Sequence, residues 1–309
     1  MIVKHIDLGI TTRCNLKCPL CYRAKGEREI IDLPFEILEK ISEIDTLEKL
    51  TVCGSLGDPV LYPHFDRMID LFLDKFRDII IVINTNGTMN SPEWWYEFGK
   101  KFSQIRGYIQ FAIDGIETYS RYRVGSTFET VFDNVMGYIS SGAMALWQFI
   151  IFDYNEYELE RAENIANQLG MIFKPIMSYK YTKKFKKPKN YNKRKVDNLE
   201  IYCRSLQENS ISIDIDGIVT PCCHLRPMKD FVFDNDIKLF IKYLKCRKDI
   251  NFLENSLENI FNSEFFKYLY ENYKETNICK RSCYYYRYKN PSTIYTWRPL
   301  NYANKKSEH

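Results

Sequence analysis

Apolar positions in the first part of the chain alternate between short β-branched runs and longer amphipathic stretches. Short apolar runs bounded by turn residues are typical of buried parallel strands, and apolar residues that recur every three or four positions predict helices. The predicted strands are 2–10, 50–53, 79–83, 108–113, 147–152 and 171–176. The predicted helices are near 34–44, 63–76, 92–103, 128–141 and 156–169. Six strands with intervening helices predict an α/β fold, a partial (β/α)6 TIM-like barrel.

The composition changes abruptly after the last predicted strand. Nine of the sixteen residues of 180–195 are Lys or Arg and none is acidic. Such a charge run is typical of a solvated surface segment. We therefore predict a barrel domain at 1–177, a basic linker at 178–198 and a smaller α+β domain at 199–309.

The smaller domain begins with a predicted hairpin. Asp216-Gly217 is a turn signal between two apolar runs. The runs are 211–215 and 218–219, and helical stretches follow near 237–245 and 258–273.

Bulk composition narrows the functional classes. Apolar residues make up 45% of the 309 residues, so the chain can bury a substantial core. It has no run of about 18 apolar residues, and polar Lys4, His5 and Asp7 stand where a signal peptide would be apolar. We expect a cytoplasmic protein with no membrane partner. Cytosolic thiols are kept reduced, so ten cysteines indicate metal binding rather than disulfides.

Three cysteines follow the first predicted strand in a CxxxCxxC pattern: Cys14, Cys18 and Cys21. Three thiolates can hold three corners of a [4Fe–4S] cube and leave the fourth iron open to another ligand. A zinc site with a remote fourth ligand is the alternative, although zinc ligands usually come as CxxC pairs. Chemistry at the carboxyl ends of the strands is expected in a parallel barrel.

With this cysteine loop, the chain resembles the radical S-adenosylmethionine (radical SAM) superfamily. The resemblance implies that the methionine part of S-adenosylmethionine chelates the open iron of a [4Fe–4S] cluster. It also implies that one electron cleaves the sulfonium to give a 5′-deoxyadenosyl radical, which abstracts hydrogen from substrate. An electron donor such as flavodoxin or ferredoxin is then expected.

A second motif leaves the second predicted strand at Gly57, Asp58 and Pro59. It resembles the G-G-E-P motif of the family, which receives the amino group of the cofactor through glycine backbone and a carboxylate. Glycine permits close backbone approach, and a carboxylate accepts charge-assisted bonds from an ammonium. This chain departs from the motif with Leu56 in place of the first glycine and with the shorter Asp58 in place of glutamate.

Further candidate cofactor residues lie at the same rim. Asn86 follows the third strand, Asp114 follows the fourth, and the resemblance places the ribose and carboxylate of the cofactor there. Arg121 or Arg123 could pair with that carboxylate, because guanidinium offers a bidentate fork, or each could be a solvated surface charge. Gln148 alternates with apolar neighbours, so we expect it to line the bore.

A second cysteine group follows the basic stretch and consists of Cys203, Cys222, Cys279 and Cys283. The set resembles the twitch or SPASM auxiliary-cluster domains, in which cysteines flank a hairpin and a late pair completes the set. The resemblance implies one second [4Fe–4S] cluster, closed by four thiolates and suited to carrying electrons. A four-cysteine zinc ribbon is the alternative. Cys223 could replace Cys222 as ligand, and we favour Cys222.

The sequence predicts a radical SAM oxidoreductase or modifying enzyme, with its auxiliary cluster as an electron relay. We favour a peptide or protein side chain as substrate; dehydrogenation of a sugar- or nucleotide-like small molecule is the alternative. The first strand begins at residue 2, so we expect no leader-peptide-binding domain before it. The catalytic residues that contact substrate are not identifiable.

The alternative from another class is a non-catalytic zinc-stapled protein that binds nucleic acid. The basic stretch interleaves Tyr181, Phe185 and Tyr191 with its charges, a pattern that can hold phosphates and stack bases. The net charge is only +4, so we rank nucleic acid below the other partners.

Overall fold

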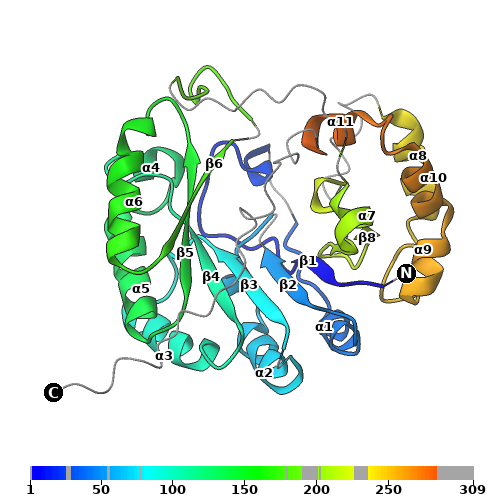
Figure 1. Cartoon of the computed structure of the whole chain (residues 1–309), viewed down its shortest axis with the longest axis horizontal. Helices are drawn as coiled ribbons and strands as arrows, with labels where there is room; N and C mark the ends of the chain where they lie inside the picture. Colours follow the sequence, from blue (N-terminus) through cyan, green and yellow to red (C-terminus); the bar gives the residue numbers. More distant parts are fainter. Residues whose placement is uncertain are drawn as a thin grey trace.

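The computed structural model describes residues 2–25, 29–53, 56–76, 78–178, 180–189, 201, 203–225 and 236–283. One eight-stranded sheet runs through it in the order β6-β5-β4-β3-β2-β1-β7-β8 (Figure 1). The strands are β1 (His5–Gly9), β2 (Lys49–Cys53), β3 (Ile80–Thr85), β4 (Gly107–Ala112), β5 (Ala145–Ile151), β6 (Ile172–Met177), β7 (Ser210–Ile213) and β8 (Val219–Thr220). Neighbouring strands from β6 to β7 are parallel, and β8 is antiparallel to β7.

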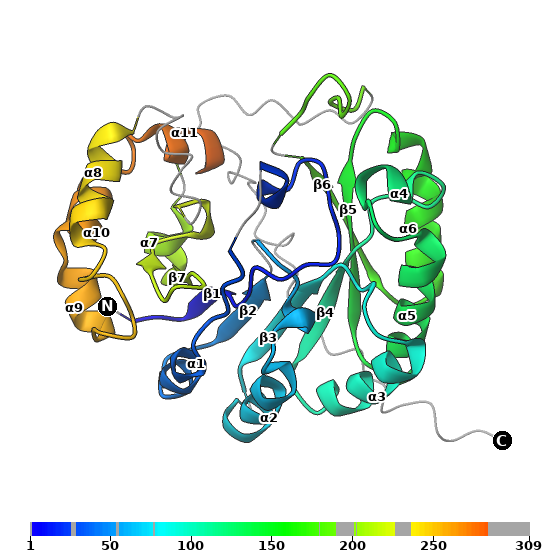
Figure 2. The ribbon, with the colours of Figure 1, turned by 180° about the vertical axis from the view of Figure 1, so that it is seen from behind.

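Helices line the outer side of the curved sheet (Figure 2). Those between the first six strands are α1 (Phe35–Ser42), α2 (Phe65–Lys75), α3 (Pro92–Phe102), α4 (Tyr119–Tyr122), α5 (Phe128–Ser140) and α6 (Leu159–Gln168). Short 3-10 turns also occur at η1 (Tyr22–Lys25), η2 (Pro59–Leu61) and η3 (Glu156–Glu158). The six strands and five helices predicted for the barrel are confirmed, with ends that differ by at most three residues. The short helix α4 was not predicted.

Alternation along the strands divides the sheet into two faces. The register places Leu8, Val52, Ile83 and Ile109 side by side on the helix-covered face, where all four are fully buried. The opposite, inner face carries a polar side chain on each of the strands β1 to β7. These side chains are Asp7, Thr51, Asn84, Gln110, Gln148, Lys174 and Ser212. The period of two thus gives the barrel an apolar outside under its helices and a polar inside.

The hairpin of the C-terminal part joins the barrel sheet rather than standing apart from it. Strand β7 pairs in parallel with β1, with Asp7 opposite Ser212. Asp216-Gly217 forms the predicted turn, and Gly217 has the positive φ of +79° that favours glycine. Strand β7 ends at Ile213, two residues before the end of the apolar run predicted at 211–215. The domain boundaries predicted at 177 and 199 stay predictions.

The remaining elements are helical: α7 (Arg204–Glu208), η4 (Cys223–Leu225), α8 (Ile237–Cys246), α9 (Leu257–Asn262), α10 (Glu264–Asn272) and α11 (Asn277–Cys283). The single helix predicted at 258–273 is wrong, because it is two helices that break at Ser263. The extended backbone of Ser263 ends α9, and its hydroxyl accepts a hydrogen bond from the Phe266 N–H to cap α10.

Most of residues 180–189 are exposed, as expected for a solvated basic segment, but the segment also packs against the barrel. Phe185 is 2% exposed and packs with Leu16, Tyr122 and Phe152 in a small cluster beside the cysteine loop. The stretch buries Phe185 while Lys183, Lys184, Lys186, Lys187 and Lys189 stay exposed, as amphipathic segments do. Residues 190–198 and Tyr191 lie outside the described residues.

Candidate functional site

The CxxxCxxC loop leaves β1 at the carboxyl end of the parallel strands. Within it the Cys21 N–H donates to the Cys18 carbonyl at 3.1 Å, a turn that brings the second and third cysteines together. Cys18 is buried, whereas Cys14 and Cys21 are half-buried. Among the described side chains, no three Cys, His, Asp or Glu groups converge closely enough to hold a single metal ion. One loop therefore offers three thiols at the barrel mouth without focusing them on one point.

Two polar side chains from neighbouring strand ends point at these sulfurs. The Asn86 amide, after β3, donates to Cys14 Sγ at 3.8 Å. The Arg123 guanidinium, which ends α4, donates to Cys18 Sγ at 3.7 Å. Hydrogen bonds to sulfur stabilise thiolate charge and tune an iron–sulfur centre. Asn86 and Arg123 are thus brought to the cysteine loop, as the sequence predicted for the rim.

Arg123 is held by the buried carboxylate of Asp114. Its Nε and Nη2 lie 2.7 and 2.6 Å from Asp114 Oδ2, and Asp114 is fully buried. The other carboxylate oxygen accepts the Ile150 N–H at 2.6 Å. Burial raises the pKa of Asp114, an effect that Arg123 opposes. Burial is the largest influence on the pKa of Arg123 and lowers it, but Asp114 and the neighbouring Cys18, Tyr122 and Tyr119 together more than offset this, so the pKa is raised and the guanidinium stays charged.

Asn155 completes this support, and sequence reasoning missed it. Its side-chain amide donates to the Asp114 carbonyl at 3.0 Å and to the Ile150 carbonyl at 3.0 Å. Asn155 is fully buried, and it joins the ends of β4 and β5. A lone Asn after a strand carries no distinctive sequence signal, because such residues are common in turns.

Asp58 contacts protein groups rather than open space. Its carboxylate accepts from the Thr85 hydroxyl at 2.9 Å, from the Asn86 N–H at 2.7 Å and from the Val60 N–H at 3.2 Å. It is 3% exposed, and burial raises its pKa against the effect of these donors. Asp58 therefore ties the loop after β2 to the end of β3. Its predicted contact with the cofactor amino group remains a prediction.

Gly57 brings this loop against the cysteine loop. A Cβ at Gly57 would overlap the carbonyl oxygens of Thr11 and Arg13, so the two backbones touch. The Asp58 N–H donates to the Arg13 carbonyl at 2.6 Å, and Pro59 opens the short turn η2 directly afterwards. The requirement for glycine is therefore steric.

The remaining predicted residues lie away from the sulfur contacts. Arg121 stacks over the Tyr154 ring at 4.0 Å, outside the pair that Arg123 makes. Gln148 faces the bore as predicted, and its side-chain oxygen accepts from Gln110 Nε2 at 2.7 Å. Lys174 Nζ lies 3.5 Å from Gln110 Oε1. Gln110 and Lys174 extend the polar inner face. The alternation of their strands was the signal that could have found them.

Burial is the largest influence on the pKa values of Cys14 and Cys18 in the first loop. It raises the pKa of Cys14 to about 11. It also raises the pKa of Cys18, although the Arg123 charge opposes this. Thiols with raised pKa values are poor nucleophiles on their own, and they become thiolates when a metal replaces their protons.

The second cysteine group is assembled from three distant elements. Cys203 precedes α7, Cys222 follows β8, and Cys279 and Cys283 lie on α11. Cys222 interacts electrostatically with both Cys203 and Cys279, and Cys283 interacts with the other three. The fold thus brings the four predicted ligands within electrostatic range of one another, although the described side chains do not converge on a single metal ion. Cys223 is exposed whereas Cys222 is half-buried, which favours Cys222 as the inward-facing thiol.

The pKa values of Cys279 and Cys283 are shifted in opposite directions. A hydrogen bond from Cys283 holds the pKa of Cys279 below its usual value, and the same bond raises the pKa of Cys283. Burial raises the pKa of Cys203 and Cys222.

Both groups fit iron–sulfur clusters by the chemistry of their donors. The first offers three thiols and hydrogen bonds to two sulfurs, which suits a cubane with one open iron. The second offers four thiols, which suits a closed cubane. All ten cysteines of the chain carry free thiols, and no described helix has the length and apolar character of a membrane span.

Comparison with curated proteins finds partial relatives. The chain is 32% identical over 121 residues to the tungsten-containing aldehyde ferredoxin oxidoreductase cofactor-modifying protein of Pyrococcus furiosus, a match that covers 38% of this chain and 32% of that protein. It is 26% identical over 90 residues to the antilisterial bacteriocin subtilosin biosynthesis protein AlbA of Bacillus subtilis, covering 29% and 20%. The matched segments thus span a third or less of the length of these two relatives.

Solved structures share the fold. Streptococcus suis SuiB bound to its precursor peptide SuiA matches with a TM-score of 0.61 at 12% identity, covering 86% of this chain and 66% of that one. BtrN in complex with AdoMet and 2-DOIA matches with a TM-score of 0.53 at 14% identity, covering 91% and 92%. At these identities the likeness concerns the fold alone.

Family sequence models match most of the chain. The radical SAM superfamily model covers residues 8–163, and the SPASM model, an iron–sulfur cluster-binding domain, covers 203–284. These domains imply a [4Fe–4S] cluster that binds S-adenosylmethionine, S-adenosylmethionine itself and auxiliary [4Fe–4S] coordination, as the resemblance predicted. The two cysteine groups, placed at the barrel mouth and behind the hairpin, lie within the two matched segments. The chain belongs to the radical SAM superfamily and carries a SPASM iron–sulfur domain.

Proposed function

We propose that this chain abstracts a hydrogen atom from a carbon of a peptide or protein side chain, with a second cluster exchanging the substrate electron. The observation that carries the proposal is the juxtaposition at the barrel mouth. There the CxxxCxxC loop, with hydrogen bonds from Asn86 and Arg123 to its sulfurs, lies at the carboxyl ends of strands whose inner face is polar.

Cys14, Cys18 and Cys21 would hold the first cluster in this proposal. When bound, that cluster would supply one electron to the sulfonium of S-adenosylmethionine and be oxidised by one electron, the chemistry that generates a hydrogen-abstracting radical from the cofactor. The residues of this chain orient and shield the site. Asp114 and Asn155 fix Arg123 against Cys18, and Asp58 fixes the end of β3, where Asn86 meets Cys14.

Water exclusion is the other task of the chain, because the radical attacks whatever lies closest. Phe152 and Phe185 are almost fully buried and pack with Tyr122 and Leu16 beside the cysteine loop. Gln110, Gln148 and Lys174 face the bore and offer amide and ammonium groups that can hold a polar substrate by hydrogen bonds.

Two relatives support a peptide substrate. AlbA is named for subtilosin biosynthesis, and SuiB is solved with its precursor peptide. A second candidate is dehydrogenation of a sugar- or nucleotide-like small molecule. The near-complete coverage of BtrN, which is solved with AdoMet and 2-DOIA, favours this candidate.

The second cysteine group, in this proposal, holds one auxiliary [4Fe–4S] cluster through Cys203, Cys222, Cys279 and Cys283. Four thiolate ligands leave no open iron, so this cluster would carry electrons. The enzyme would work in the cytoplasm, where cysteines stay reduced and able to bind iron, with flavodoxin or ferredoxin as electron donor.

Deuterium transfer from fractionated extract tests the substrate class. The enzyme, reconstituted without oxygen, is given dithionite, S-adenosylmethionine and extract of its source cells grown on deuterated medium. The extract is split into a peptide and protein fraction and a small-molecule fraction. Deuterium in 5′-deoxyadenosine from the first fraction alone supports the peptide proposal.

Deuterium from the second fraction alone would replace it with the small-molecule reaction. The Cys14→Ala/Cys18→Ala/Cys21→Ala variant is the control, because it keeps the second cysteine group and should form no 5′-deoxyadenosine. If the wild-type enzyme also forms none, the proposed chemistry itself fails.

A further inference from the structure

Helix α8 carries two parallel exposed stripes of different character. Ile237, Ile241 and Leu244 recur at the i, i+4, i+7 spacing that places side chains on one helix face. They are 58%, 46% and 52% exposed. Large apolar side chains grouped in this way mark an interaction surface rather than scattered surface residues.

The stripe is not the core face of the helix. Leu239, Tyr243 and Cys246 form that face and are at least 93% buried. Helix α8 therefore satisfies the core with one side and presents a second apolar row to the surface. A helix needs only one such row to dock on its own domain.

The second stripe is basic and lies one residue further along. Lys238, Lys242 and Lys245 repeat the same spacing, and Arg247 and Lys248 follow the helix. Lys242 pairs with Glu264 at 2.6 Å. Lys238, Lys245 and Lys248 form no salt bridge with any residue in the described ranges. The surface is thus apolar along one line and cationic along the next.

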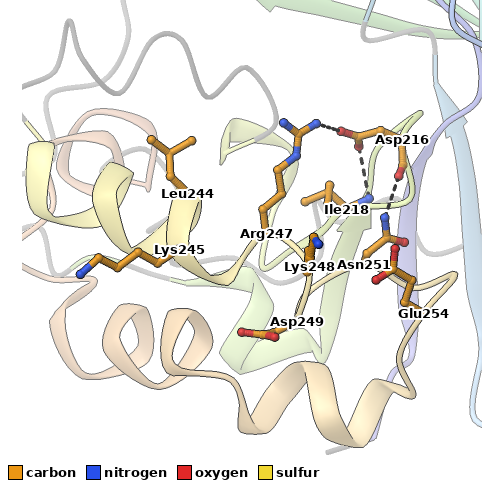
Figure 3. A pocket seen from close by; sticks show the side chains of 9 residues that line it. All are labelled: Asp216, Ile218, Leu244, Lys245, Arg247, Lys248, Asp249, Asn251 and Glu254. Atoms are coloured by element: carbon orange, nitrogen blue, oxygen red, sulfur yellow. Dashed lines mark hydrogen bonds and ion pairs between the residues drawn. The ribbon is translucent and has the colours of Figure 1, made fainter.

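A cavity of about 560 Å³ continues this surface at the C-terminal end of α8 (Figure 3). Leu244, Lys245 and Lys248 line it, together with the Arg247–Asp216 pair at 2.8 Å and the acidic Asp249 and Glu254. The charges of the cavity are therefore balanced, and the cationic character belongs to the stripe on the helix itself. Figure 3 shows Lys245 extending away from the Arg247–Asp216 pair. The cavity can accept a side chain of a docked partner.

The N-terminal end of α8 contacts the helix that carries Cys279 and Cys283. Asp236, the residue before the helix, accepts the Asn277 N–H at 3.0 Å and the Ile278 N–H at 3.1 Å. These are the first residues of α11, and the next residue is Cys279. The stripes therefore begin one residue from a contact with the helix that carries two of the predicted cluster ligands.

Charge decides what this surface accepts. The cationic stripe requires an acidic occupant. The C-terminal segment 284–309 has five Lys or Arg residues and one acidic residue, so its charge is opposite to what the surface requires. Because α8 contacts the helix that carries Cys279, we expect the partner to be a protein that exchanges electrons.

We propose that the two stripes of α8, the docking face, bind a small acidic one-electron carrier protein that exchanges an electron with the auxiliary cluster. The inference rests on the proposed function of the second cysteine group. When the carrier gives the electron, it is oxidised by one electron and the cluster is reduced by one. No bond forms or breaks in this step.

Stopped-flow reduction without oxygen tests the docking face. The probe is an acidic flavodoxin in its fully reduced form, and cluster bleaching is followed in the full-length reconstituted protein. Lys238→Glu/Lys245→Glu should slow the second-order reduction roughly tenfold at low ionic strength, and added salt should shrink the difference. Ile241→Ser/Leu244→Ser should raise the concentration of flavodoxin at half-saturation about threefold to tenfold with little salt dependence.

The matched control is Lys183→Glu/Lys187→Glu, which makes the same charge change on two exposed lysines of the segment that follows β6. Strand β6 lies across the molecule from α8 (Figure 1). It should leave the rate within about twofold of wild type. If the control slows reduction as much as the α8 variant does, general charge steering replaces the docking face. An α8 variant as fast as wild type also overturns the proposal.

Two further measurements separate a docking defect from loss of the cluster and from membrane binding. Dithionite should reduce the cluster of all variants at the wild-type rate. If the wild-type protein has no second cluster, the proposed function is wrong rather than the docking face. Co-sedimentation with vesicles of phosphatidylserine and phosphatidylcholine tests the other acidic surface. Vesicle binding that Lys238→Glu/Lys245→Glu abolishes, with the flavodoxin rate unchanged, would assign the face to a membrane and overturn the carrier.

Discussion

The two cysteine groups reach similar chemistry by opposite routes. Cys14, Cys18 and Cys21 come from one loop, and their positions relative to each other are set mainly by local sequence spacing. The auxiliary four come from segments that range over 203–283 and meet because α11 packs against η4, the turn that directly follows the hairpin. A local group can be recognised from spacing, whereas a dispersed group needs the fold.

The surroundings of the sulfurs differ as well. The first loop receives donors from outside itself, the Asn86 amide and the Arg123 guanidinium. In the second group, the described influence on Cys279 is largely from its neighbour Cys283. Thr276 also hydrogen-bonds Cys279, and backbone groups next to Cys203 and Cys222 hydrogen-bond those sulfurs. The first loop is thus contacted by side chains of the barrel rim, whereas the second group is contacted by residues of its own segments.

The largest expected effect is the loss of S-adenosylmethionine cleavage on removing the first group. Cys14→Ala/Cys18→Ala/Cys21→Ala should abolish dithionite-driven 5′-deoxyadenosine and lower iron from about eight to about four per chain, because three ligands of one cubane are lost. Chromatographic product assay and iron analysis measure this. Retained cleavage would mean that the reactive cluster lies elsewhere.

A variant of the second cysteine group should lose its cluster and still cleave S-adenosylmethionine. Cys222→Ser should also remove about four irons, yet it should leave uncoupled cleavage of S-adenosylmethionine largely intact, because the first loop is untouched. Cys223→Ser is the matched control and should keep about eight irons, since that thiol is exposed. The reverse result would move the ligand assignment to Cys223.

Removing Arg123 should destabilise the protein by about 3–5 kcal/mol, because Asp114 would be left buried without its partner. Arg121→Ala, at an exposed stacking residue, should cost less than about 1 kcal/mol. Urea unfolding of the apo-protein compares Arg123→Ala with Arg121→Ala. Equal losses would mean that the buried pair does not hold the rim.

The smallest expected effect is at Asn86. Asn86→Ala removes its donation to Cys14 and its 3.0 Å bond to Asn15, so stability should fall by about 1–2 kcal/mol. The cluster should remain, with a shifted reduction potential, because hydrogen bonds to sulfur tune that potential. Thr88→Ser, which keeps a hydroxyl for the Asn86 oxygen, is the control and should leave the potential unchanged. A redox titration that finds equal potentials in Asn86→Ala and wild type would leave Asn86 a structural role alone.

Much of the barrel could be predicted from the sequence because its signals are local. The apolar runs of the strands and the helical periodicity between them depend on neighbouring residues, and the observed elements follow them. The break at Ser263 was missed, because an apolar pattern on both sides of a capping serine continues without interruption. The pairing of β7 with β1 was also missed, because strand order depends on contacts between distant residues.

At the site, the residue types could be predicted from the sequence, but the side chains that each residue contacts could not. Arg121 and Arg123 were alternative candidates in the sequence, and the fold pairs Arg123 with Asp114 and stacks Arg121 on Tyr154. Asp58 was predicted to face a cofactor, and the fold surrounds it with Thr85, Asn86 and Val60 donors. Asn155 had no signal at all, since its role is defined by the two strand ends that it joins.

The sequence by itself determined the family, the barrel elements and the three-cysteine loop, because each is encoded in residues close together along the chain. Only the tertiary structure decided which arginine meets Cys18, that the basic stretch packs Phe185 beside the loop, and that the auxiliary cysteines become neighbours. These contacts join residues far apart in sequence. Their free energy comes from burial and pairing that exist only once the sheet and its loops have folded together.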